Sequence, residues 1–176
     1  LADIHSVTLE EKSHLLCPNN PLQAIIDECK TMVQTYYDSP LADENKKKQI
    51  QRMLNIGQEM IINTGEYKGR RCIINTELNS SNFLINGEKE ENYIIDWEKP
   101  IQGEPAQDLG HFLAPTTTFW KTDIILSQEE IESFTKEYIR VVGNRFDTGD
   151  IEERLKLYLP ITCLRGITWC AMAWVQ

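Results

Sequence analysis

Apolar residues at helical spacing predict two long amphipathic helices in the first part of the chain. From Pro21 to Tyr37, apolar side chains recur at intervals of three and four residues, which places them on one face of a helix. Asn20 stands where an N-cap residue is favoured, and Pro21 suits the first helical turn. The same spacing runs from Asp43 to about Asn63. We therefore expect two consecutive helices in this part of the chain.

The pattern then changes to short runs that are typical of β-strands. These runs are rich in Ile, Leu and Phe, and they cover Cys72–Ile74, Asn82–Ile85 and Asn92–Ile95. Asn86-Gly87, between the last two runs, favours a turn. We expect a small antiparallel element, with its Asn92–Ile95 strand buried, followed by a loop over Lys99–Pro105.

Helical signals return in the second half of the chain. Ala106–Leu113 is predicted to form a short helix that ends before Pro115. Ser127 and Glu130 have the spacing of a capping box and are expected to open a further helix. Asp150 is suited to cap the last helix.

The end of the chain is apolar nearly all round from Ile161 to Val175, which predicts a central helix. Pro160 is expected to interrupt it, and Cys163 and Cys170 are expected in the core. The fold class is therefore mainly α with a small antiparallel β element (α+β), and residues 1–176 are expected to form one domain.

Composition excludes some classes of protein. A net charge of −9 argues against a nucleic-acid binder, which would carry a basic stripe. The five cysteines form no C-x-x-C pair, and an odd number favours reduced thiols and a cytoplasmic location. No apolar run reaches the roughly 18 residues of a membrane span. Both ends read as cut from a longer chain, because protein termini tend to be polar.

Carboxylate and amide side chains concentrate between Cys72 and Glu98. Glu77 and Asn82 share a polar loop, where a carboxylate can orient a hydroxyl nucleophile and an amide oxygen can ligate Mg²⁺. Strand alternation is expected to turn Asp96 and Glu98 toward one face. The competing interpretations are a polar turn bonded to its own backbone and a strand end held in a salt bridge.

Asp108 has two possible roles. It stands in the first turn of the predicted Ala106–Leu113 helix, where an acidic residue is favoured by the helix dipole. It either caps that helix or reaches back to fix the Glu77 loop. The second role is supporting and not chemical.

Three motifs combine in a familiar order. The chain reads Asn75-Thr76-Glu77-Leu78-Asn79-Ser80-Ser81-Asn82, then Ile95-Asp96-Trp97-Glu98, then Glu104-Pro105-Ala106-Gln107-Asp108-Leu109-Gly110. This order resembles the aminoglycoside phosphotransferase and choline kinase family, whose members are small-molecule kinases related in fold to protein kinases. The opening Leu1-Ala2-Asp3-Ile4-His5 is similar to the end of a large-lobe helix in that family, so the resemblance covers nearly the whole chain.

The resemblance implies a helical C-terminal lobe of a protein-kinase-like fold and transfer of phosphate from ATP, with Mg²⁺, to a small-molecule hydroxyl. Glu77 falls at the catalytic-base position, Asn82 and Asp96 at the positions that hold Mg²⁺ and the nucleotide, and Glu98 at a second acidic position near the metal. Asp108 matches the acid that braces the catalytic loop. Two positions depart from the family motif, which usually has His at the place of Asn75 and Asp at that of Glu77.

The resemblance also implies a nucleotide-binding N-terminal β lobe, which is absent from this chain and would precede Leu1, so that this piece alone is expected to be inactive. The acceptor is expected to be a small hydroxyl compound, with a cationic one as an alternative, and Trp120 is the best candidate for a pocket residue. The alternatives are a pseudokinase-like binding module without turnover and a helical domain unrelated to kinases.

Overall fold

Helices make up most of the structure, a computed structural model that describes residues 1–10 and 13–176. The helices are α1 (Ala2–Ser6), α2 (Pro21–Asp38), α3 (Glu44–Ile61), α4 (Pro105–Leu113), α5 (Pro115–Thr122), α6 (Gln128–Val142) and α7 (Ile151–Trp174). The remaining elements are β1 (Cys72–Ile74), the 3-10 turn η1 (Ser80–Asn82), β2 (Phe83–Leu84), β3 (Tyr93–Ile94) and β4 (Ile101–Gly103). The predicted α+β class is confirmed. No helix in the described residues is long and apolar enough to cross a membrane.

The two predicted amphipathic helices are confirmed as α2 and α3. The side chain of Asn20 accepts a hydrogen bond from the backbone N–H of Gln23 and caps α2, while Asp43 caps α3 in the same way. The predicted capping box at Ser127 and Glu130 is present at the start of α6. These local signals fixed where three of the helices begin.

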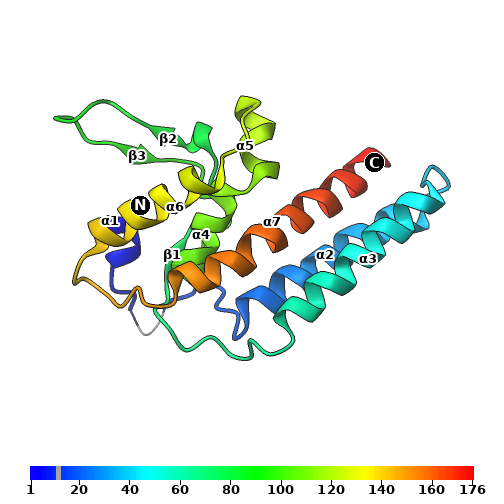
Figure 1. Cartoon of the computed structure of the whole chain (residues 1–176), viewed down its shortest axis with the longest axis horizontal. Coiled ribbons are helices and arrows are strands. Elements are labelled where there is room, and N and C mark those ends of the chain that lie inside the picture. The colour runs from blue at the N-terminus through cyan, green and yellow to red at the C-terminus, as the bar shows by residue number, and fades with distance from the viewer. Residues whose placement is uncertain (11–12) are drawn as a thin grey trace.

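Helix α7 is the element on which the other long helices pack. It contacts α2, α3, α4 and α5, and Figure 1 shows it running alongside α2 and α3. The beginning of the segment predicted to be central, Ile161–Val175, is buried as expected, with Ile161 and Leu164 in the core. Its last turns differ from the prediction, because Trp169, Cys170 and Trp174 are exposed.

The predicted interruption at Pro160 is wrong, because α7 runs through it. A proline inside a helix removes one backbone hydrogen bond and costs about 3 kcal/mol. Pro160 lies on the exposed side of α7, where the released carbonyl can reach water. Its neighbours Tyr158 and Ile161 are fully buried, and their burial offsets this cost.

The strands form two antiparallel pairs, and one of the four strands differs from the prediction. Part of the expected loop over Lys99–Pro105 is β4, which pairs with β1 through Cys72↔Gly103 and Ile74↔Ile101. β2 and β3 form the predicted hairpin, which projects from the molecule (Figure 1). The expected burial of its second strand is wrong, because Tyr93 and Ile95 are exposed on the projecting hairpin.

Helix α5 is an element that the apolar pattern did not predict. Pro115 occupies its first turn, a position that tolerates proline because the missing N–H has no helical partner there. None of its residues is buried, so it carries no apolar stripe that the sequence could reveal. Gly166 lets α5 approach α7, since a Cβ there would lie 3.1 Å from the Cβ of Thr116.

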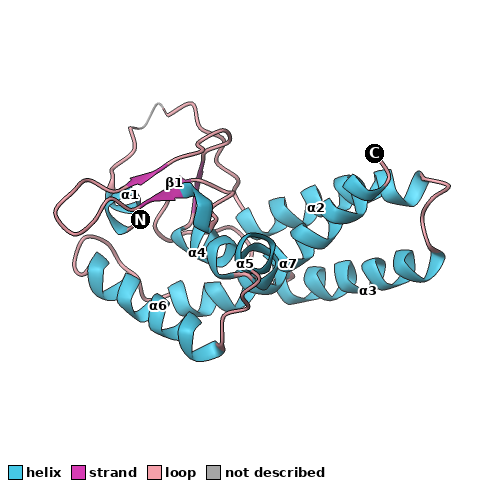
Figure 2. Ribbon diagram, turned by 90° about the horizontal axis from the view of Figure 1, so that it is seen from above, coloured by secondary structure: helices cyan, strands magenta, loops and turns pink. Residues whose placement is uncertain are grey.

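The buried residues form two groups. The first joins α2, α3 and α7, and the second lies at the other end of the molecule from α2 and α3. Figure 2 shows α1, α6 and β1 gathered at that end. The buried side chains come from α1, α4, α6 and the start of α7: Ala2, Leu109, Leu113, Tyr138, Val142, Ile151 and Leu155. Helix α4 lies between the two groups, so its position depends on both.

A buried ion pair joins the start of α4 to α7. The fully buried carboxylate of Glu104 accepts hydrogen bonds from the Arg154 guanidinium, with Nε at 2.6 Å, and from the Tyr158 hydroxyl. Burial raises the pKa of Tyr158, which keeps its hydroxyl protonated as a donor. A buried charge without such partners would destabilise the fold.

We predict that Glu104→Gln lowers the free energy of unfolding by about 3 kcal/mol, because it leaves the Arg154 charge without its counter-ion in the interior. Urea unfolding followed by circular dichroism measures the change. The control is Glu137→Gln, which breaks an Arg–Glu pair of similar geometry with Arg140 on the exposed face of α6 and is expected to change little. Equal effects of both substitutions would contradict this role for Glu104.

Candidate active site

The buried carboxylate of Asp108 holds the loop that carries Glu77. Both of its oxygens accept the backbone N–H of Asn75, at 3.0 and 2.9 Å, and one accepts the N–H of Thr76 at 3.0 Å. The side chain of Asp108 is fully buried in the first turn of α4. Of the two roles considered for Asp108, the structure shows the second: Asp108 braces the Glu77 loop.

A close approach between helices fixes the position of Asp108. Gly110, two residues later in α4, faces α7, and a Cβ on it would lie 2.5 Å from the Cβ of Tyr158. Only glycine permits this separation without a shift of one helix. Asp108 and α4 thus fix the position of the Glu77 loop relative to the central helix α7.

A buried histidine extends the network to α6. His5 Nε2 donates to Asp108 Oδ2 at 3.3 Å, and the Tyr138 hydroxyl lies 2.7 Å from His5 Nδ1. Burial raises the pKa of Tyr138, so its hydroxyl is the donor in this pair. The sequence did not predict this role of His5, because the contact joins residues 103 and 133 positions apart in the chain.

Asn75 joins the Glu77 loop to the segment that carries Asp96. Its side-chain nitrogen donates to the backbone carbonyl of Asp96 at 2.8 Å, and its side-chain oxygen accepts the N–H of Glu77 at 3.2 Å. The side chain is almost fully buried, which strengthens these bonds relative to exposed ones. Two of the predicted site residues are therefore brought together through their backbones by one amide.

Asn82 is connected to the same two segments. Its side-chain nitrogen donates to the carbonyl of Glu77 at 3.3 Å, and its own carbonyl accepts the N–H of Ile95 at 2.9 Å. With the nitrogen so engaged, the amide oxygen faces away from the loop carbonyl. That oxygen is the atom that suits a hard cation.

Two residues of the site have a strained backbone. Thr76 has φ of +70° and Asp96 has φ of +66°, the left-handed region that side chains with a Cβ rarely adopt. The hydrogen bond that Thr76 N–H donates to Asp108 and the one that Asn75 donates to the Asp96 carbonyl maintain these conformations. Backbone strain of this kind clusters at functional sites.

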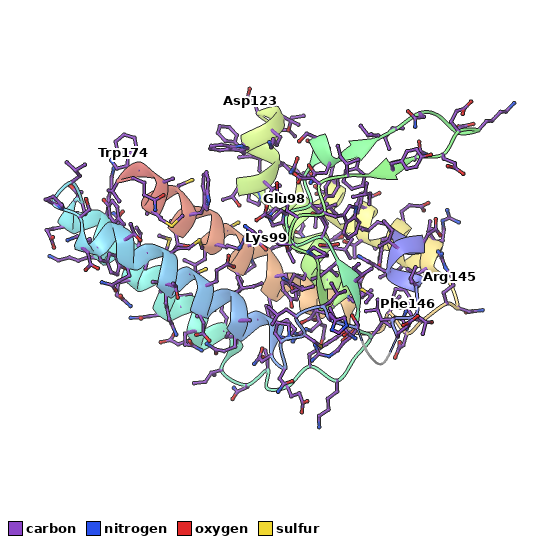
Figure 3. The ribbon with its side chains drawn as sticks, turned by 180° about the vertical axis from the view of Figure 1, so that it is seen from behind. Glu98, Lys99, Asp123, Arg145, Phe146 and Trp174 are labelled. Atoms are coloured by element: carbon purple, nitrogen blue, oxygen red, sulfur yellow. The ribbon has the colours of Figure 1, made fainter. Side chains whose placement is uncertain are left out.

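The positive φ of Asp96 also corrects one prediction. Strand alternation was expected to align Asp96 with Glu98, but β3 ends at Ile94 and the turn at Asp96 breaks the extended backbone. Both carboxylates are exposed. Figure 3 shows Glu98 and Lys99 near the middle of the molecule.

The described residues contain no closed metal site. In residues 1–10 and 13–176, no three His, Cys, Asp or Glu side chains are placed to hold a metal ion. Mg²⁺ bound with a nucleotide needs no such cage, because one or two carboxylates, waters and phosphate oxygens complete its octahedral shell. Asn82, Asp96 and Glu98, the residues expected to hold Mg²⁺, offer oxygen atoms, which suit Mg²⁺ better than a softer metal.

Glu77 lies between two cationic side chains. Its Oε1 is 3.5 Å from Arg165 Nη2 and 3.9 Å from Lys99 Nζ. Arg165 is itself held by Glu28 in a two-point ion pair at 2.8 and 3.0 Å. Burial opposes the charge of Arg165, but the two carboxylates outweigh it and raise its pKa. The Glu77 carboxylate is thus held in a fixed electrostatic setting.

A pocket of about 570 Å³ opens beside Glu77. Its walls come from α5, α7 and the Glu77 loop, and it is lined by Glu77, Asn79, His111, Thr116, Thr117, Phe119, Trp120, Lys121, Thr162, Arg165, Gly166, Ile167, Trp169 and Cys170. His111 Nδ1 donates to the carbonyl of Leu78 at 2.7 Å and so supports the loop from α4. Burial lowers the pKa of His111, which favours the neutral ring.

Comparison of the chain with protein-family models, curated proteins and solved structures gave no match. The chemistry of the site therefore has to follow from its own contacts. Those contacts hold the segments of Glu77, Asn82 and Asp96 together as one loop and one turn. Glu77 also lines the pocket.

We predict that Asp108→Asn frees the Glu77 loop, because the side-chain amide places a donor against backbone N–H groups that need acceptors. The expected result is faster hydrogen exchange at the Asn75 and Thr76 amides and a loss of about 2 kcal/mol in the free energy of unfolding. Amide exchange followed by NMR measures the first effect directly. The control is Asp123→Asn in the exposed turn after α5, which should change neither. Unchanged protection of the two loop amides in Asp108→Asn would rule out the brace.

Proposed function

We propose that this chain is the helical catalytic lobe of an ATP- and Mg²⁺-dependent phosphotransferase that acts on a hydroxyl group of a small molecule. The observation that carries the proposal is the hydrogen bond from the Asn75 side chain to the Asp96 carbonyl. It joins the loop of the candidate base to the turn of the candidate metal ligand. Phosphoryl transfer depends mostly on such positioning and on electrostatic stabilisation.

Each candidate residue has a role that its surroundings support. Glu77 lines the pocket and would orient the acceptor hydroxyl and accept its proton. The amide oxygen of Asn82 and the carboxylate of Asp96 would hold Mg²⁺, with Glu98 acting through water. The metal supplies positive charge to the phosphate oxygens of ATP. Asp108 touches no substrate and positions the loop.

Glu77 is one methylene longer than the aspartate of the family motif. Its ion pairs with Arg165 and Lys99 restrict where the longer side chain places its carboxylate. Such restriction supports activity, because a displacement of about 1 Å can cost about 100-fold in rate. The resemblance implies a nucleotide-binding β lobe in addition to this chain, so the proposed activity is tested on the full-length protein.

A pseudokinase-like binding module is the second candidate. The same two ion pairs favour it, because Arg165 and Lys99 already contact the carboxylate oxygen that would have to receive the acceptor hydroxyl. In this alternative the protein binds nucleotide and acceptor without turnover. The two candidates differ in turnover and agree on the metal site.

We predict that Asp96→Ala and Glu77→Gln each reduce ATP consumption by the full-length protein by roughly 100-fold, measured over a panel of amino sugars, choline and small alcohols. The two variants should differ in nucleotide binding. Asp96→Ala should abolish the Mg²⁺ dependence of nucleotide binding, because a metal ligand is lost. Glu77→Gln should leave this Mg²⁺ dependence unchanged.

The control for this assay is Glu137→Gln on α6, which lies outside the candidate site. Mg²⁺-dependent nucleotide binding without turnover on any acceptor would favour the pseudokinase-like module. Activity on an acceptor that neither Asp96→Ala nor Glu77→Gln reduces would refute the proposed mechanism.

A further inference from the structure

We propose that the pocket beside Glu77 binds an uncharged acceptor whose body is a flat apolar ring, with its hydroxyl directed at Glu77. This inference rests on the proposed function and adds the class of substrate to it. The features that point to it are an aromatic corner, the charge of the lining and the way α5 is fixed on α7.

Two tryptophans form the aromatic corner. The rings of Trp120 and Trp169 are 5.9 Å apart and nearly perpendicular, at 87°. They are 65% and 45% exposed although both line a pocket. A planar ring that stacks on one indole would meet the edge or face of the other, and both contacts are favoured geometries for aromatic pairs.

The charge of the lining disfavours a cationic ligand. Among the described residues that line the pocket, Glu77 is the carboxylate, whereas Lys121 and Arg165 are cations. Glu77 is already paired with Arg165 and Lys99. His111 adds no negative charge, and the lowered pKa of its buried ring keeps it neutral. A cation would therefore meet the positive charge of Lys121, an Arg165 shared between Glu28 and Glu77, and a carboxylate that is already engaged.

The wall that carries Trp120 is held against α7. Thr116, one turn before Trp120 in α5, lies over Gly166, where a Cβ would be 3.1 Å from the Thr116 Cβ. Trp169 follows Gly166 in α7 by three residues, so the contact between the helices sets the distance between the two indoles. A corner built in this way is present before the ligand arrives, which lowers the entropic cost of binding.

The test compares two ligands that share a ring and carry either an uncharged hydroxyl or a cationic trimethylammonium group. 2-Naphthylethanol and (2-naphthylmethyl)trimethylammonium are titrated into the protein, without ATP or Mg²⁺, and binding is followed by ligand-observed NMR. We expect the uncharged alcohol to bind at least about fivefold more tightly. Equal or tighter binding of the ammonium compound, or no binding of the alcohol, would overturn the proposal.

Two variants locate the binding. Trp120→Ala should weaken binding of the alcohol about tenfold, whereas Trp174→Ala, at an exposed position outside the lining, should not change it. Lys121→Glu should shift the preference toward the ammonium compound, because it reverses one charge of the lining. An unchanged affinity in Trp120→Ala, or an unchanged preference in Lys121→Glu, would contradict the assignment.

Failure of this inference is distinguishable from failure of the proposed function. If the alcohol binds as expected but the full-length protein transfers no phosphate to any acceptor, the pocket assignment stands and the phosphotransferase does not. If phosphate is transferred to choline or an amino sugar while the naphthyl alcohol does not bind, the phosphotransferase stands and the acceptor class is wrong.

Discussion

The carboxylate of Asp108 is the group on which the arrangement of the candidate site depends. It is fully buried, and a buried charge is tolerated only where hydrogen bonds replace its hydration. The N–H groups of Asn75 and Thr76 and the ring of His5 provide these bonds. Because α4 packs closely on α7 at Gly110, the same carboxylate fixes the loop relative to the helical core.

The strain at Thr76 and Asp96 follows from this arrangement. A positive φ costs on the order of 1–3 kcal/mol at a residue with a side chain. Charge-assisted bonds to Asp108 and the buried amide of Asn75 offset that cost. The backbone of the site is thus set before any ligand binds, which is what a reaction that relies on positioning requires. Residues farther from the loop, such as Glu98, are exposed and follow the turn at Asp96.

The sequence predicted those parts of the fold whose signals are local. Helices α2, α3 and α6 each have an apolar stripe and a capping side chain; α2 and α3 were predicted close to their bounds, and the start of α6 was predicted by its capping box. Helix α5 and strand β4 were missed, because α5 buries nothing and β4 depends on pairing with a distant segment. At the site, motif order singled out Glu77, Asn82, Asp96 and Asp108. The links through His5 and Asn75 are tertiary contacts, and no periodicity reveals them.

The most direct test of the central claim, that the Asn82 and Asp96 segments meet at one metal–nucleotide site, uses a paramagnetic ion in place of Mg²⁺. Mn²⁺ with a non-hydrolysable ATP analogue is added to the full-length protein, and the broadening of backbone amide NMR signals is measured. The proposed site predicts that the Asn82 and Asp96 signals broaden first. Broadening that begins instead at the acidic surface of α6, near Glu129 and Glu132, with both loop signals unchanged, would contradict it.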